Sequence, residues 1–289
     1  MKIYIDGQYF EEADAKISVF DHGLLYGDGV FEGIRAYNHR IFKLDEHLER
    51  LYDSAKALML KVPLDLADMR AATIDACRRN NIKDGYIRLL VTRGKGSLGL
   101  SPDSCPRATV IIIAAEIELY PREFYTKGLR VATAPTRRTA PAALSPSVKS
   151  LNYLNNIMGK IEGKLCGAQE VVMLNEQGYV AEGSGDNIFV LKKGKLYTPP
   201  IFVGALGGIT RAVVIGLAAE AGLPLIETHL TRYDLFVADE VFLTGTGAEV
   251  IPVVEIDGRP IGNGSPGAVT RGMMDAYHKL TRAEGAPIL

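Results

Sequence analysis

Residues 108–117 read ATVIIIAAEI, a run that is apolar almost throughout. A strand with one solvated face alternates apolar and polar residues, and this run does not alternate. We therefore expect it to be a central strand, with a neighbour on each side. YIRLLVTRG, at 86–94, precedes it and predicts a further strand of the same sheet.

The length and charge of the chain restrict its class. At 289 residues it is too long for one ordinary core, so we expect two domains. Hydrophobic residues make up 47% and charged residues 23%, the balance of a water-soluble globular protein. A net charge of -1 and the lack of a basic tract argue against nucleic acid or a membrane as a partner. Without a signal peptide or a bilayer-spanning run, and with three scattered cysteines, we expect a cytoplasmic protein that holds no metal.

The first part of the chain predicts a mixed α/β domain. FEGIRAYNHRIFKL, at 31–44, indicates two strands joined by a turn near Asn38 and His39. Residues 45–60 follow, with apolar residues at helical spacing and Asp45 as the expected N-cap. We also expect short strands at 2–10 and 17–20 and a second helix at 65–80.

The apolar pattern breaks at LYPREFYTKG, residues 119–128, where a proline, a glycine and several charges occur together. Such a break is typical of a domain boundary. We therefore predict a small α/β domain over 1–120, a linker over 121–127 and a larger domain over 128–289.

The second part predicts hairpins and helices in turn. Apolar residues from Leu151 to Leu165 mark one face of a helix that ends near Gly167. Two successive hairpins, a helix with Gly222 as its stop signal and a return to strands are then expected at 171–183, 187–199, 208–223 and 240–258.

Lys149 lies in SPSVKSLNYLNN, residues 145–156, with no acidic residue for several positions on either side. Most lysines are solvated surface charges, and Lys149 has that interpretation too. A lysine that attacks a carbonyl group must be neutral, however, and a stretch without acids favours the neutral amine. Lys149 is therefore a candidate nucleophile.

Two glycine-bearing turns are candidate anion sites. LGGITR, at 206–211, ends a loop and opens a helix near Ile209, where free N–H groups and the helix dipole attract anions. LTGTGAE, at 243–249, places the hydroxyl of Thr246 between two glycines. Either segment alone has the interpretation of an ordinary turn. Neither is a nucleotide-binding motif of the Walker or GxGxxG type.

Two charged residues complete the set of candidates. Arg50 lies off the apolar stripe of its helix, where it either pairs with Glu46 or binds a phosphate with its guanidinium fork. Glu182 lies among apolar residues at a strand end, and a partly buried carboxylate needs a donor. That donor is either a protein group or the nitrogen of a bound heterocycle.

Six segments in order give the chain a family resemblance: YGDGVFEGIR, HLERLYDSAK, VKSLNYLNN, YVAEGSGDNIF, GITR and TGTGAE. Together they resemble the fold-type IV, or class IV, pyridoxal-phosphate aminotransferases, and most of all the branched-chain amino acid aminotransferases. The resemblance covers about residues 3–275. It implies an α/β (α+β) fold, with a small open α/β sandwich, a larger pseudo-barrel and the cofactor at the domain interface.

The resemblance implies the cofactor pyridoxal 5′-phosphate and reversible amino transfer between L-leucine, L-isoleucine or L-valine and 2-oxoglutarate. Lys149 matches the lysine that forms the aldimine and moves the proton between the substrate Cα and the cofactor. Glu182 matches the carboxylate that keeps the pyridine nitrogen protonated. Other positions match the ligand of the ring hydroxyl (Tyr153), an apolar contact of the ring (Leu206) and the phosphate cup (Arg50, Ile209, Thr210 and Thr246).

The resemblance also implies a substrate pocket. Arg88 matches an arginine associated with the distal carboxylate of glutamate, and the amides at Thr246 and Gly247 match those that meet the α-carboxylate. The other matching pocket positions are Tyr26, Phe31, Gly33 and Tyr86. An ordinary strand with a surface ion pair is the alternative for Tyr86 and Arg88.

Related activities of the same fold type match the sequence less well. D-amino acid aminotransferases carry an arginine and a histidine after the TRG stretch, where this chain has KGSLGLSP. Aminodeoxychorismate lyases have an arginine where Tyr153 stands. Gly207 replaces a proline that is common in branched-chain enzymes. R-selective amine transaminases fit the sequence poorly. A cofactor-free homologue and a lysine-dependent aldolase are remote alternatives. The family forms homodimers or larger homo-oligomers, so we expect one here.

Overall fold

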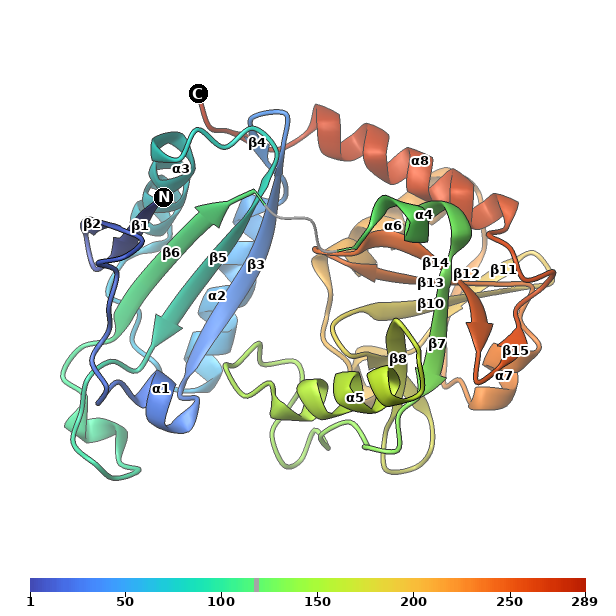
Figure 1. Cartoon of the computed structure of the whole chain (residues 1–289), viewed down its shortest axis with the longest axis horizontal. Coiled ribbons are helices and arrows are strands. Elements are labelled where there is room, and N and C mark those ends of the chain that lie inside the picture. Colours follow the sequence, from blue (N-terminus) through green and yellow to red (C-terminus); the bar gives the residue numbers. More distant parts are fainter. Residues whose placement is uncertain (117–119) are drawn as a thin grey trace. The chain divides into compact units, whose positions relative to one another are not determined.

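The computed structural model describes residues 1–116 and 120–289 as two compact units (Figure 1). The first unit comprises Met1–Ile117, Val148–Asn152 and Thr281–Leu289, and the second comprises Glu118–Ser147 and Tyr153–Leu280. The short segment around Lys149 therefore belongs to the first unit. The domain boundaries drawn above stay a prediction, and the segment 119–128 behind them begins outside the described residues.

In the described part of the first unit, seven antiparallel strands form one sheet in the order β16-β4-β3-β5-β6-β1-β2. Strand β6 lies between β5 and β1, which confirms the central position predicted for residues 108–116. The strands are β1 (Lys2–Ile5), β2 (Gln8–Glu11), β3 (Gly29–Tyr37), β4 (Arg40–Ile41), β5 (Gly85–Thr92), β6 (Thr109–Ala115) and β16 (Ala286–Pro287).

Helices α2 (Leu44–Ala57) and α3 (Leu66–Arg79) pack on one face of this sheet (Figure 1). The apolar side chains of α2 at helical spacing, such as Leu48 and Leu51, are fully buried against it. Alternate residues of a strand point to opposite faces, so β3 contributes Val30 and Ile34 to this core and turns Phe31 to the other side. A short helix, α1, spans His22–Tyr26.

Two predictions for the first unit are wrong. Residues 17–20 were expected to form a strand, but they run through an exposed turn, with Val19 68% exposed, so they lack the burial that would favour pairing. Asp45 does not cap α2. The helix begins earlier because Leu44 is drawn into the core, so Lys43 is the N-cap with φ 52° and Asp45 lies in the first turn.

In the described part of the second unit, nine strands form a mixed sheet. Its order is β12-β11-β10-β13-β14-β7-β8-β9, and β15 also pairs with β14. Strand β9 packs beside β10 as well, so the sheet curls back toward itself. The strands are β7 (Leu129–Thr133), β8 (Glu170–Leu174), β9 (Val180–Gly183), β10 (Asn187–Lys192), β11 (Lys195–Thr198), β12 (Leu225–Glu227), β13 (Glu240–Gly245), β14 (Glu249–Ile256) and β15 (Arg259–Pro260).

Most local predictions for this unit are confirmed, but the helix expected from Leu151 begins at Leu154, because the Leu151 amide pairs with Gly29 instead. The hairpins expected at 171–183 and 187–199 are β8–β9 and β10–β11, and the predicted helix at 208–223 is α6. The helices are α4 (Arg122–Lys127), α5 (Leu154–Leu165), α6 (Ile209–Glu220), α7 (Arg232–Phe236) and α8 (Ala268–Ala283), whose last residues belong to the first unit. Among the described residues, no helix is both long and apolar enough to cross a bilayer.

Helix α5 packs in an unusual orientation. Its predicted apolar face is exposed, with Leu154 at 75% and Leu165 at 82%. The side that packs on β8 carries small and polar residues instead, and its buried members are Asn156, Gly159 and Gly163. The apolar face of α5 is therefore available to another surface.

Candidate functional site

The backbone of Lys149 is held by two elements of the first unit. The amide of Phe31, on β3, donates to the Lys149 carbonyl at 3.0 Å, and Leu151 donates to Gly29 at 2.9 Å. The Lys149 amide in turn donates to the hydroxyl of Ser54, on α2, at 3.2 Å. The half-buried Lys149 side chain ends 4.7 Å from the centre of the Phe31 ring. The position of Lys149 is thus fixed because its own segment, residues 149–151, pairs with β3, which is distant in the sequence.

The predicted pocket residues of β3 and β5 share one face of the sheet. The Arg88 guanidinium lies 4.6 Å from the ring centre of Phe31 and 5.3 Å from that of Tyr86. Gly33 stands directly opposite Arg88 in the antiparallel register, and a Cβ there would overlap the Tyr86 hydroxyl. The structure therefore brings an arginine, two aromatic rings and a glycine together, on the face opposite α2 and α3.

Tyr26 ends helix α1, and its hydroxyl accepts a hydrogen bond from the amide of Gly99 at 3.0 Å. The ring packs edge-on against His22 at 5.0 Å. The hydrogen bond between Tyr26 and Gly99 joins α1 to the loop that follows β5.

Arg50 and Glu32 form a bidentate ion pair in the first unit. Arg50 Nε donates to Glu32 Oε1 at 2.7 Å, and Arg50 Nη2 donates to Oε2 at 2.7 Å. His47, one turn earlier on α2, contacts Oε2 through Nδ1 at 2.7 Å. The carboxylate partner of Arg50 is thus a residue of β3, whereas Glu46 pairs with Lys43.

Glu182 is the corresponding buried carboxylate of the second unit. Arg138 Nε donates to Oε1 at 2.7 Å, and the amide of Leu206 donates to Oε2 at 2.8 Å. Arg138 also donates through Nη1 to Asn155 Oδ1 at 2.7 Å, on the helix that begins just after Tyr153. A carboxylate has about four acceptor positions, so each oxygen of Glu182 retains acceptor capacity for a further donor.

Asp186 and Asn187, where β10 begins, lie against the two glycine turns. The side chain of Asn187 donates to the Leu206 carbonyl at 2.9 Å, and a Cβ at Gly208 would overlap its Oδ1 atom. A Cβ at Gly245 would overlap Oδ1 of Asp186 in the same way. The segments LGGITR and LTGTGAE therefore lie against two adjacent residues, Asn187 and Asp186 respectively, although more than thirty positions separate the segments in the sequence.

The two turns have the features of an anion site. Ile209 and Thr210 open α6, so their amides lie in the first turn of a 12-residue helix. Thr246 and Gly247 are half-buried in the turn after β13. Next to them, the buried Oγ1 atom of Thr244 lacks a hydrogen-bond partner among the described residues. Such an orphaned polar atom is expected where a polar ligand completes a site.

Several of these residues were not singled out from the sequence. Arg138 lies in an irregular segment and carries no local signal of its role. Asp186 and Asn187 follow two glycines, which indicates only a turn. Glu32 did offer a signal, since it places an acidic residue among the apolar residues and glycines at 29–34.

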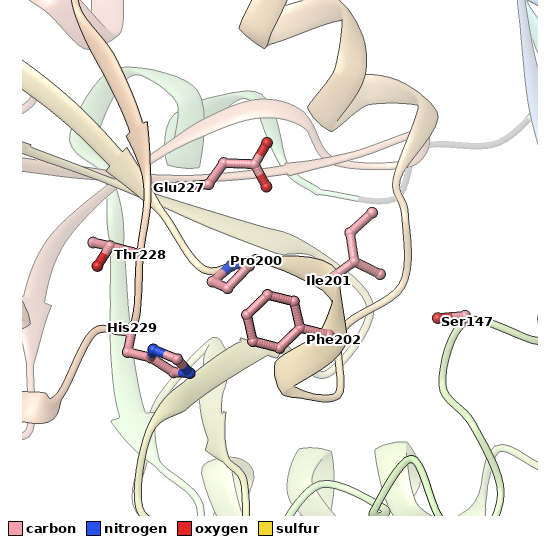
Figure 2. A pocket seen from close by; sticks show the side chains of 7 residues that line it. All are labelled: Ser147, Pro200, Ile201, Phe202, Glu227, Thr228 and His229. Atoms are coloured by element: carbon pink, nitrogen blue, oxygen red, sulfur yellow. The ribbon is translucent and has the colours of Figure 1, made fainter.

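The second unit also has a cavity of about 640 Å³ (Figure 2). Figure 2 shows the rings of Phe202 and His229 at its wall and Glu227 above them. Glu227 pairs with Arg211 of α6 at 2.6 Å. The residues that line the cavity are Ser147, Pro200, Ile201, Phe202, Glu227, Thr228 and His229. None of the site residues predicted from the sequence is in this lining.

Comparisons with known proteins identify the relatives of this chain. The family model for amino-transferase class IV matches residues 29–256. A protein of Methanocaldococcus jannaschii is 48% identical over 288 residues, which cover 100% of this chain and 99% of that protein.

Solved structures give the same relationship. The branched-chain amino acid aminotransferase of Escherichia coli superposes with a TM-score of 0.95 at 37% identity, covering 98% of this chain and 95% of that one. The branched-chain amino acid aminotransferase of Thermobaculum terrenum, in its PLP-bound holo form, superposes with a TM-score of 0.89 at 30% identity. The coverage there is 98% of this chain and 94% of the other.

We predict that Arg138→Met destabilises the second unit by about 3–5 kcal/mol, because it leaves the buried Glu182 carboxylate without its ion partner. Urea unfolding followed by circular dichroism measures the loss. Adding Glu182→Gln removes the uncompensated charge, so the double variant should recover part of the lost stability. The exposed Arg122→Met is the matched control. Equal stability of Arg138→Met and the control would contradict this prediction.

Proposed function

The chain belongs to the class IV aminotransferases, and we propose that it transfers the amino group of L-leucine, L-isoleucine or L-valine reversibly to 2-oxoglutarate. Branched-chain transamination is the activity of the relatives that match the chain from end to end. The observation that carries the choice of substrates is the cluster of Phe31, Tyr86 and Arg88 on one sheet face. Aromatic walls suit an aliphatic side chain, and an arginine suits the second carboxylate of glutamate.

The reaction depends on pyridoxal 5′-phosphate, whose aldehyde bonds to amines and whose ring delocalises the electron pair left at the substrate Cα. Lys149 is the proposed covalent anchor, and the same amine moves the proton at Cα. The fixed backbone of Lys149, between β3 and α2, supports this role. An amine that removes a proton must be placed within hydrogen-bond reach of it.

Three residues are proposed to hold the ring. Glu182 keeps the proton on the ring nitrogen, Tyr153 donates to the ring hydroxyl, and Leu206 packs on the ring face. The two hydrogen bonds that Glu182 accepts from Arg138 and Leu206 support its assignment, because they hold the carboxylate in one orientation. The second of them also ties the backbone of Leu206 to the carboxylate.

The phosphate is proposed to bind to Arg50, to the amides of Ile209 and Thr210 and to Thr246. The start of α6 provides amides that point away from the helix, together with the positive end of its dipole. The hydrogen bond from Asn187 to the Leu206 carbonyl, which holds the loop before α6, and the orphaned Thr244 oxygen fit a polar group of this kind.

The remaining pocket residues are proposed to select the substrate. The amides at Thr246 and Gly247 hold the α-carboxylate, while Tyr26, Phe31 and Gly33 surround the side chain. Phe31 and Arg88 are within cation–π distance of each other, so the arginine has an alternative partner when the substrate is aliphatic. One pocket can then accept both leucine and glutamate.

We infer a cytoplasmic location from the cysteines. Cys77, Cys105 and Cys166 are odd in number and far apart in the sequence, which favours a reducing compartment. Amino acids and 2-oxo acids are the proposed small-molecule partners.

We also propose that the protein forms a homodimer through the exposed face of α5. Leu154, Ile157, Met158 and Ile161 make one apolar stripe on that face. A stripe of this kind is self-complementary, because a two-fold axis places it against its own copy. A net charge of -1 leaves little repulsion between the copies.

The substrate assignment is tested in a half-reaction on the purified protein. We expect L-leucine and L-glutamate each to remove the visible absorbance band of the bound cofactor, and D-alanine and R-phenylethylamine to leave it unchanged. Bleaching by D-alanine would instead indicate a D-amino acid aminotransferase, and bleaching by the amine an amine transaminase. A protein that stays colourless after cofactor is added would exclude the enzyme assignment altogether.

We expect Lys149→Ala to abolish transamination, because no other amine is proposed to act at the substrate Cα. The variant should still bind the cofactor, since the phosphate contacts remain. Steady-state rates and equilibrium dialysis measure the two properties separately. Lys61→Ala, at an exposed lysine, is the control. Near-normal turnover by Lys149→Ala would remove this lysine from the mechanism.

The dimer proposal predicts that Ile157→Glu shifts the protein toward monomers. A carboxylate at the centre of an apolar contact loses hydration without gaining a partner. Light scattering after gel filtration gives the mass, with Lys61→Glu, at an exposed lysine outside α5, as the control. A monomeric wild-type protein, or an unchanged mass in Ile157→Glu, would show that α5 is not the interface.

A further inference from the structure

Glu32, His47 and Arg50 form a buried cluster whose purpose the proposed reaction leaves unexplained. The side chain of Glu32 is fully buried, that of His47 is 2% exposed and that of Arg50 is 13% exposed. Glu32 lies on β3, on the face that α2 covers, whereas its neighbours Phe31 and Gly33 face the proposed substrate pocket. A charge in this position costs stability unless it has strong donors.

The donors keep Glu32 ionised. Burial alone would raise the pKa of its carboxyl group, but the hydrogen bonds from His47 and Arg50 outweigh burial and lower the pKa to about 2. Burial lowers the pKa of His47, so its imidazole is neutral near neutral pH. A carboxylate can only accept hydrogen bonds, so the proton of the neutral ring lies on Nδ1 and is donated to Glu32.

This arrangement fixes the direction of the Arg50 guanidinium. Two parallel bonds from Nε and Nη2 hold one edge of the planar group, which sets its plane and the direction of its other edge. His47 contacts the same oxygen that accepts from Nη2, so the carboxylate is itself prevented from rotating. An arginine held this way loses less conformational freedom when it binds an anion.

We propose that Glu32 and His47 are positioning residues, which hold Arg50 in the orientation that binds the cofactor phosphate. This inference rests on the proposed function, in which Arg50 is a phosphate ligand. It adds that the affinity for phosphate depends on a carboxylate that does not touch the cofactor. The alternative is that the cluster only attaches α2 to β3.

The test compares two ligands that differ in the phosphate group. Dissociation constants of pyridoxal 5′-phosphate and of pyridoxal are measured by spectral titration of the full-length chain freed of cofactor. We expect Glu32→Gln to weaken binding of the phosphorylated ligand about tenfold or more, since it loosens a charge-assisted contact. Binding of pyridoxal should change by less than about twofold, within the scatter of a neutral substitution.

Arg50→Lys separates this inference from the proposed function. The ratio to compare is the affinity for pyridoxal 5′-phosphate divided by the affinity for pyridoxal, and Arg50→Lys should lower it. The double variant Glu32→Gln/Arg50→Lys should lower this ratio little further than Arg50→Lys alone, because the two residues act through one contact. Asp45→Asn is the matched control. Asp45 lies on α2, like Arg50, but it is exposed and pairs with Arg70 of α3. If Arg50→Lys left the ratio unchanged, the phosphate role of Arg50 and the inference built on it would both be wrong.

A structural role alone would give a different result. Glu32→Gln would then lower the thermal unfolding temperature of the cofactor-free chain but leave the ratio of affinities at the wild-type value, which would overturn the inference. If Glu32→Gln does not fold, His47→Gln provides the same readout. It keeps the ion pair and frees the carboxylate to rotate, so we expect a smaller loss in the same direction. An unchanged ratio in His47→Gln would likewise overturn the proposal.

Discussion

The buried carboxylate is the constraint on which both units depend. A carboxylate that leaves water must find charged or amide donors, and its donors then become fixed in turn. Glu32 joins β3 to α2 through Arg50 and His47 in the first unit. Glu182 joins β9 to the loop before α6 through Leu206, and to the segment of Arg138, in the second. In each unit a residue proposed to hold the cofactor is bonded to such a group, Arg50 to Glu32 and Leu206 to Glu182.

Close packing around glycines shapes the proposed site near these buried carboxylates. The Tyr86 hydroxyl fills the space that a side chain at Gly33 would occupy, and the side chain of Asn187 does the same at Gly208. Glycine at these two positions allows that close approach, which a Cβ would prevent. Gly208 is also the N-cap of α6, where the first amides of the helix lack partners within their own element.

Much of the local structure was predictable because its causes are local. The turn at Asn38 and His39, where both residues have positive φ, joins two strands in the way their sequence indicates. Predictions failed where contacts with distant residues decide the outcome. Burial of Leu44 moved the start of α2, and an apolar stretch at 17–20 found no burial to favour a strand. For α5 the periodicity identified the apolar face, but not which surface that face meets.

The sequence by itself determined the order of the motifs, the candidate lysine, the two glycine turns and most helices and strands, because these follow from propensity and spacing. Only the tertiary structure decided which groups meet. Arg50 pairs with Glu32, 18 positions away, and Arg138 with Glu182, 44 positions away. Asp186 and Asn187 lie against turns that are distant in the chain. Such pairs depend on sheet register and on how helices pack, and these are properties of the whole fold.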